Sequence, residues 1–181
     1  MKKALVVLAP GFEETEAVQP IDLLRRAGII VHVAGLSGGQ VTGSHGITLV
    51  ADLLLGEVED SYDVLILPGG MPGAQYLADS PTLDILLRTA WESNQLVAAI
   101  CAAPAVVLGS KGLLAGRKFT CFPGMEGGFK DSQFLAQAVV VDGQLITSRG
   151  LGTSGAFGLA IVEALVGASK AREVGERALV I

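Results

Sequence analysis

Residues 96–105 read Leu96-Val97-Ala98-Ala99-Ile100-Cys101-Ala102-Ala103-Pro104-Ala105, an apolar run that meets a cysteine and continues into small residues. Five or six consecutive apolar residues predict a strand that is buried on both faces. The residues after Cys101 suit a helix, and Pro104 is tolerated in its first turn because that position needs no N–H. The stretch therefore predicts a strand, a tight turn at Cys101 and a helix.

Cys101 has two interpretations at this turn. Free N–H groups and the positive end of the helix dipole would point toward the sulfur, which favours a reactive thiolate. The small side chains of Ala102 and Ala103 would let a ligand approach. A lone cysteine in an apolar stretch is, however, usually buried and inert. This stretch alone leaves both interpretations open.

The composition narrows the class of protein. A length of 181 residues suits one domain over residues 1–181, and half of the residues are hydrophobic while only 17% are charged. Such a chain has a large buried share, and we expect a homo-oligomer. The net charge is −5 and the basic residues form no long run. We therefore expect neither a nucleic-acid partner nor binding to an anionic membrane.

The cysteines and the first residues indicate a cytoplasmic protein. The apolar run Ala4–Ala9 is short for a signal peptide and is better interpreted as the first strand. Cys101 and Cys121 form neither a disulfide framework nor a metal-ligand pattern, so we expect reduced thiols and no metal. His32 and His45 are the only histidines. We interpret His32 as a strand residue, His45 as a turn or interface residue, and Cys121 as structural.

Strands and helices alternate along the chain. We expect strands at 4–8, 29–35, 64–67, 96–100, 118–120, 138–142 and 145–148, and a small hairpin over 41–49. Helices are expected over 13–27, 73–77, 80–93, after Cys101, over 153–166 and over 169–178. Strands that bracket helices predict an α/β fold with an open, mostly parallel sheet and helices on both faces. Such sheets bind ligands beyond the carboxyl ends of their strands, where the loops 10–16, 68–72, 101–102 and 148–154 should converge.

Three motifs in these loops have competing interpretations. Glu13, Glu14 and Glu16 would compensate the dipole of the first helix, yet one of them can reach Cys101. Burial would then raise the pKa of that acid, and the protonated acid would donate a hydrogen bond to a thiolate. Pro68-Gly69-Gly70 is either a tight turn or a source of backbone N–H groups for an oxyanion. Residues 150–155 match G-x-G-x-x-G, but only helices follow, so we interpret them as a capped turn and not as a dinucleotide site.

These residues together resemble the ThiJ/PfpI superfamily, in the YajL-like branch that contains the parkinsonism-associated deglycase. The resemblance covers nearly the whole chain, with motifs in matching order. It implies a flavodoxin-like three-layer sandwich, a homodimer and no cofactor. The motifs that carry it are Gly11-Phe12-Glu13-Glu14-Thr15-Glu16, Arg25-Arg26-Ala27-Gly28, Leu67-Pro68-Gly69-Gly70, Ala99-Ile100-Cys101-Ala102 and Thr147-Ser148-Arg149-Gly150-Leu151-Gly152-Thr153-Ser154.

The resemblance assigns roles to individual residues. It makes Cys101 the nucleophile and Glu16 the protonated carboxylate that contacts it. The backbones of Gly69, Gly70 and Ala102 match the positions that bind an oxyanion.

The chain also departs from the family at three positions near the nucleophile. Phe122 stands before Pro123 where the deglycase has histidine, and Leu151 replaces a proline and would alter the pocket rim. Ala102 occupies the position at which protease-like and amidotransferase-like relatives carry a histidine. The lack of a nearby histidine argues against a hydrolase or amidotransferase of that kind.

The activity implied by the resemblance is that of a cysteine-dependent glyoxalase or protein deglycase with a role in oxidative and carbonyl stress. Its substrates would be methylglyoxal, glyoxal or their early adducts with amines and thiols. The alternative is a redox-responsive chaperone or stress sensor whose cysteine is oxidised and does not turn over. The same thiolate would serve both functions, so the motif does not separate them.

Overall fold

The computed structural model describes residues 1–59, 61–129 and 131–181. Its strands are β1 (Lys3–Leu8), β2 (Ile30–Gly35), β3 (Gln40–Thr42), β4 (Thr48–Val50), β5 (Leu53–Leu54), β6 (Val64–Leu67), β7 (Leu96–Ile100), β8 (Lys118–Phe119), β9 (Gln133–Phe134), β10 (Val139–Asp142) and β11 (Leu145–Ser148). Its helices are α1 (Glu14–Arg26), α2 (Gly73–Ala78), α3 (Pro81–Glu92), α4 (Ser154–Val166) and α5 (Ala168–Arg177). Shorter helical turns are η1 (Leu55–Glu57), η2 (Pro104–Leu108), η3 (Gly109–Lys111) and η4 (Leu151–Thr153).

The main sheet contains seven strands within the described ranges, in the order β10-β11-β7-β6-β1-β2-β5. Neighbouring strands are parallel except for β10 and β11, which are antiparallel and form a hairpin. Because β1, β6, β7 and β11 are parallel, their carboxyl ends lie at one edge of the sheet. The four loops singled out in the sequence follow these ends, as predicted.

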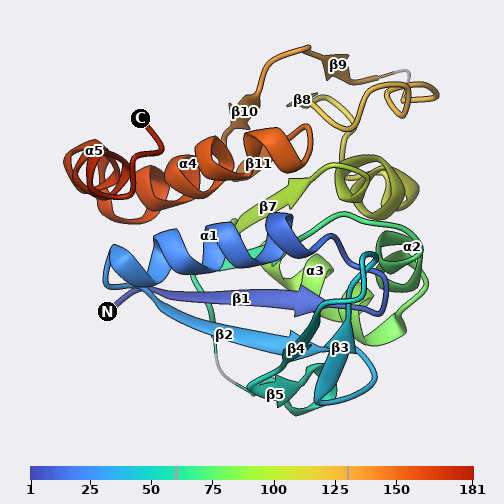
Figure 1. Cartoon of the computed structure of the whole chain (residues 1–181). Coiled ribbons are helices and arrows are strands. Elements are labelled where there is room, and N and C mark those ends of the chain that lie inside the picture. Colours follow the sequence, from blue (N-terminus) through green and yellow to red (C-terminus); the bar gives the residue numbers. More distant parts are fainter. Residues whose placement is uncertain (60, 130) are drawn as a thin grey trace.

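Helices cover both faces of the sheet and divide the core in two. Figure 1 shows α1, α4 and α5 over one face, where α1 contacts α4 and α4 contacts α5. In β1 the side chains of Ala4, Val6 and Leu8 belong to the core under these helices. The intervening side chains of β1 belong to the other core, with residues of α2, α3 and η2. This alternation over the apolar residues 4–8 of β1 is typical of a sheet that is buried on both faces.

Most elements expected from the sequence are present with their ends shifted by a residue or so. The hairpin β3–β4 stands apart from the main sheet, as does the pair β8–β9. The two-residue strands β5 and β9 were not predicted, because a strand of two residues has no periodicity to detect. In the part of the chain that the structure describes, no helix is long and apolar enough to cross a membrane.

Candidate active site

Cys101 lies in a strained turn between β7 and η2. Its φ is 64°, in the left-handed region that costs a non-glycine residue about 1–2 kcal/mol. Two backbone hydrogen bonds hold this conformation: the Cys101 N–H donates to the Ser148 carbonyl at 3.0 Å, and the Phe122 N–H donates to the Cys101 carbonyl at 2.8 Å. The predicted turn at Cys101 is confirmed, and its strain lies where a reactive group would be presented.

Glu16 reaches this turn from the first turn of α1. Glu13 caps the helix by accepting the Glu16 N–H at 2.7 Å, which fixes where the Glu16 side chain starts. The side chain is only 1% exposed, and its Oε2 accepts the Gly69 N–H at 3.1 Å. The Cys101 thiol and the Leu151 backbone also lie near the carboxyl group and act on its pKa. Of the three acids, Glu16 is therefore the one beside the sulfur.

The pKa of Glu16 is raised from 4.5 to about 7. Burial is the main cause, since it disfavours the charged carboxylate, and the negative charge of Glu13 acts in the same direction. Hydrogen bonds from Cys101, Gly69 and Leu151 oppose this rise. Glu16 therefore exchanges its proton near neutral pH, as the sequence analysis expected of a buried acid at this place.

The surroundings of the Cys101 thiol act against the low pKa that its reactive interpretation requires. Burial, the charge of ionised Glu16 and the hydrogen bond to Glu16 raise the pKa of Cys101 to about 12. The Gly70 and Ala102 N–H groups act in the expected direction but are outweighed. The sequence analysis counted the neighbouring acid as a protonated donor and left out the desolvation of the sulfur, which is the main effect that the fold adds.

Glu16 and Cys101 consequently behave as one acid–base unit. Each group alters the pKa of the other, so their protons are released as those of a pair and not of either residue alone. A proton that moves from sulfur to carboxylate gives a thiolate beside a protonated Glu16. This form is the one that attacks an electrophile.

The backbone N–H groups at the site are divided between the two members of the pair. Those of Gly70 and Ala102 point to the sulfur, at positions expected to bind an oxyanion. The Gly69 N–H, expected in the same set, is instead bonded to Glu16. A Cβ on Gly69 would lie 2.5 Å from the Cys101 Cβ and 2.6 Å from the Glu16 Oε2. Gly69 therefore permits the close approach of the pair.

Phe122 and Leu151 lie at the outer side of the site, where they were expected as rim residues. Their side chains are 49% and 54% exposed. A Cβ on Gly150 would lie 3.7 Å from both the Phe122 ring and the Glu16 Oε1. The backbone at Gly150 therefore lies between the exposed Phe122 ring and the Glu16 carboxyl group. The Leu151 side chain thus faces outward, while its backbone N–H faces Glu16.

Two other candidate residues, Glu14 and His32, make contacts that support the fold and do not reach Cys101. Glu14 is buried and accepts the His45 N–H at 2.7 Å and the Ile47 N–H at 3.3 Å, so it attaches the β3–β4 hairpin to α1. Burial alone would raise the pKa of Glu14, but these hydrogen bonds outweigh it and hold the pKa below 4.5. The Nδ1 of His32 lies 3.0 Å from the Tyr62 hydroxyl, away from the site.

Cys121 and the acids at the start of α1 offer no second reactive centre. Cys121 is fully buried, and burial raises its pKa to about 11. Glu13, Glu14 and His45 bring possible metal-ligand atoms within 4.8 Å of one another. These acids, however, already act as the helix cap and the anchor of the hairpin.

Sequence reasoning missed the contribution of the turn after β11. The Ser148 carbonyl supports Cys101, and the Leu151 N–H supports Glu16. The hydroxyls of Ser148 and Thr153 were visible in the sequence, but we interpreted residues 150–155 only as a capped turn before a helix. Thr153 makes no capping bond to α4 and instead bonds within the turn.

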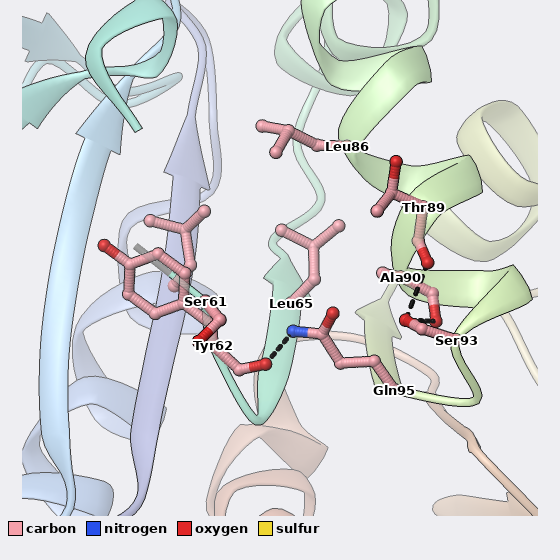
Figure 2. A pocket seen from close by; sticks show the side chains of 9 residues that line it. Ser61, Tyr62, Leu65, Leu86, Thr89, Ala90, Ser93 and Gln95 are labelled. Carbon is pink, nitrogen blue, oxygen red and sulfur yellow. Dashed lines mark hydrogen bonds between the residues drawn. The ribbon is translucent and has the colours of Figure 1, made fainter. Parts of the chain in front are cut away.

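A cavity of about 210 Å³ lies elsewhere, between α3 and the strands β1 and β6. Figure 2 shows Leu65 and Leu86 along its apolar wall and the Gln95 side chain directed at the Tyr62 carbonyl, to which it donates a hydrogen bond. Tyr62 and Gln95 precede β6 and β7, so the cavity opens at the amino edge of the sheet. It is separate from Cys101 at the carboxyl edge.

The chain is similar to known proteins over nearly its whole length. A model of the DJ-1/PfpI family matches residues 2–164. The chain is 44% identical over 183 residues to Protein dj-1beta of Drosophila melanogaster, and the match covers 99% of this chain and 97% of that protein. It is 40% identical over 176 residues to a Caenorhabditis elegans protein named Glutathione-independent glyoxalase DJR-1.2, with 93% and 91% covered.

The similarity extends to a longer plant protein and to a solved structure. The chain is 47% identical over 178 residues to Protein DJ-1 homolog B of Arabidopsis thaliana, but it spans only 41% of that longer protein. The crystal structure of Drosophila melanogaster DJ-1beta matches with a TM-score of 0.94 and 43% identity, over 98% of this chain and 97% of that one. The predicted α/β fold with a mostly parallel sheet and helices on both faces is thereby confirmed.

Proposed function

The chain belongs to the DJ-1/PfpI family, and from this premise we propose that it is a cofactor-free glyoxalase or deglycase that uses Cys101. Its substrates are methylglyoxal, glyoxal or their early adducts with amines and thiols. The relative named as a glutathione-independent glyoxalase supports this class of activity. The observation that carries the proposal is the buried Glu16–Cys101 pair, whose proton is exchanged near neutral pH.

The reaction needs a nucleophile and one proton shuttle. The Cys101 thiolate adds to the aldehyde carbon of methylglyoxal, and the Gly70 and Ala102 N–H groups stabilise the oxygen that becomes negative. Glu16 then moves a proton from the former aldehyde carbon to its neighbour, which gives a thioester of lactate. Water hydrolyses this thioester, and lactate and the free thiol are released. The aldehyde carbon is oxidised while its neighbour is reduced, so no external oxidant takes part.

The test is lactate formation from methylglyoxal in a buffer without thiols, which removes spontaneous adducts. Wild type should form lactate, and Cys101→Ser should form none above the uncatalysed rate. Cys121→Ser is the matched control and should retain activity, because Cys121 is fully buried away from substrate. A wild type without activity, or equal activity in Cys101→Ser, would contradict the proposal.

A second function, redox sensing with a protective role under stress, is favoured by one feature of the same site. The sulfur of Cys101 faces two N–H donors, from Gly70 and Ala102, beside a carboxyl group that carries a proton at moderately acidic pH. These donors suit the oxygens of a sulfenic or sulfinic acid. Oxidation would end turnover, so the two functions would alternate at one residue.

We propose that the protein forms a homodimer through α1 and the β3–β4 hairpin. Val18 on α1, Ile47 beside the hairpin loop and Val50 in β4 are apolar and exposed in the monomer. Their burial in a shared interface would remove apolar surface from water. The apolar composition of the chain supports the same assembly.

A further inference from the structure

The cavity beside α3 has apolar walls from three elements of the fold. Leu5 of β1 and Leu65 of β6 are 2% and 3% exposed, and Leu86 and Ala90 complete the wall from α3 (Figure 2). An apolar cavity of about 150 Å³ with walls of this kind stays dry and takes up benzene. A volume of about 210 Å³ is therefore sufficient for one aromatic ring or a small fused pair of rings. We refer to this space as the α3 cavity.

One amide oxygen, that of Gln95, is directed into the α3 cavity. The Gln95 Nε2 donates to the Tyr62 carbonyl, and because a carbonyl only accepts, this bond fixes which end of the amide is nitrogen. The Gln95 N–H donates to the Ala90 carbonyl at 2.8 Å, which holds the residue against the end of α3. Figure 2 shows the amide oxygen on the side away from Tyr62, toward the space between Leu65 and Ala90. Within the part of the chain that the structure describes, the Gln95 Oε1 receives no hydrogen bond.

Two hydroxyl groups that line the α3 cavity use their hydrogens on the backbone of α3. The Thr89 Oγ1 donates to the Ile85 carbonyl at 2.9 Å. The Ser93 Oγ donates to the Thr89 carbonyl at 2.7 Å and to the Ala90 carbonyl at 3.2 Å. Their lone pairs remain, so both hydroxyls can meet a ligand only as acceptors. A molecule that suits this cavity must therefore bring its own N–H or O–H.

The α3 cavity opens at the amino edge of the sheet. Tyr62 and Gln95 line both this cavity and an adjoining surface hollow of about 490 Å³, in which Lys2 and Asp63 form an ion pair at 2.7 Å. The Tyr62 hydroxyl lies 3.0 Å from the His32 Nδ1, which holds the tyrosine ring in place beside the opening. A small molecule can thus enter from the hollow without separation of α3 from the sheet.

We propose that the α3 cavity is a second small-molecule site, which binds a small aromatic compound with one hydrogen-bond donor, such as an indole or a phenol. The ring lies between Leu65 and the apolar side chains of α3, and its N–H or O–H donates to the Gln95 Oε1. Removal of apolar surface from water supplies most of the binding free energy, while the amide oxygen sets the orientation. Because the cavity and Cys101 lie at opposite edges of the sheet, this site does not depend on the proposed function.

The first experiment compares two probes of nearly equal shape with the full chain. Indole carries an N–H, whereas benzofuran has an oxygen in its place. In ¹H–¹⁵N spectra, indole should shift the signals of residues 89–95 and of the Gln95 side-chain amide in a saturable way. Benzofuran should bind about five-fold more weakly, which corresponds to one neutral hydrogen bond. Equal affinity for the two probes, or no saturable shift at these residues, would overturn the proposal.

Two variants test the acceptor and the space separately. Gln95→Met removes the amide oxygen and keeps the length of the side chain, so indole should then bind no better than benzofuran. Ala90→Leu fills the cavity from α3 and should abolish binding of both probes. Thr82→Leu is the matched control, because Thr82 is exposed on the same helix and is not part of the lining, and it should bind indole as wild type does. A retained preference for indole in Gln95→Met, or unchanged binding in Ala90→Leu, would contradict the assignment.

The position of the shifted signals separates the α3 cavity from the site at Cys101. Shifts confined to the loops that carry Gly69, Cys101 and Leu151 would place indole at the candidate active site and overturn the proposal. The two probes decide the matter in wild type even if Ala90→Leu does not fold. The measurement needs no turnover of methylglyoxal, so a negative lactate result and a negative result here are separate outcomes.

Discussion

Replacement of Glu16 by glutamine should remove most of the pH dependence of stability between mildly acidic and neutral pH. Glu16 is 1% exposed, and its pKa rises from 4.5 to about 7 on folding. The folded state therefore favours the protonated acid. The stability due to this preference is complete below the pKa of the unfolded chain, and it is lost as the pH rises through the folded pKa.

The magnitude follows from the two pKa values. A rise from 4.5 to about 7, at about 1.4 kcal/mol per pH unit, corresponds to about 3 kcal/mol. Wild type should therefore lose about 3 kcal/mol of unfolding free energy, to order of magnitude, between about pH 4 and pH 8. The amide of the Glu16→Gln variant carries no proton to lose in this range, so that variant should lack this decline. The comparison of pH slopes is independent of any fixed cost of the amide beside the Gly69 N–H.

The assay is urea unfolding at a series of pH values for wild type, Glu16→Gln and Glu14→Gln. Glu14 is a matched control because it is a buried acid in the same helix with its pKa lowered. Its contribution to stability is present above 4.5 and is lost only as the pH falls below that value, so Glu14→Gln should keep the wild-type slope at higher pH. Equal slopes for wild type and Glu16→Gln would refute the assignment of a raised pKa to Glu16.

Three other outcomes are expected. Gly69→Ala should destabilise the fold by roughly 1–3 kcal/mol in urea unfolding, because its Cβ would lie 2.9 Å from the Ile100 carbonyl oxygen. The control Gly127→Ala has open space around its Cβ and should change stability by less than about 0.5 kcal/mol. Mild peroxide should add oxygen to Cys101 before the fully buried Cys121, as mapped by peptide mass spectrometry; first oxidation at Cys121 would contradict this. Light scattering at micromolar concentration should give the mass of a dimer for wild type and of a monomer for Ile47→Glu, because a stable interface buries more than about 1,000 Å² and a charge within it would be desolvated. A monomeric wild type would rule out the dimer.

The sequence was sufficient for the architecture and for the location of the site. Apolar runs such as 64–67 and 96–100 predict strands that are buried on both faces, and the alternation with helices predicts parallel pairing. Parallel pairing places the four loops that carry the candidate site residues at one edge of the sheet, and this follows without knowledge of the packing. The short strands β5 and β9 escaped prediction because two residues carry no pattern.

The balance of effects on the Cys101 thiol was determined only by the tertiary structure. The sequence shows that N–H groups and a helix end lie near Cys101, and both favour a thiolate. Burial and the charge of Glu16 act in the opposite direction and prevail, because the energy of a charge depends on how much water and which groups surround it in three dimensions. For the same reason the partner of the Gly69 N–H was absent from the sequence analysis. Residue types fix which groups exist and roughly where, whereas packing from distant segments fixes which of them share a proton.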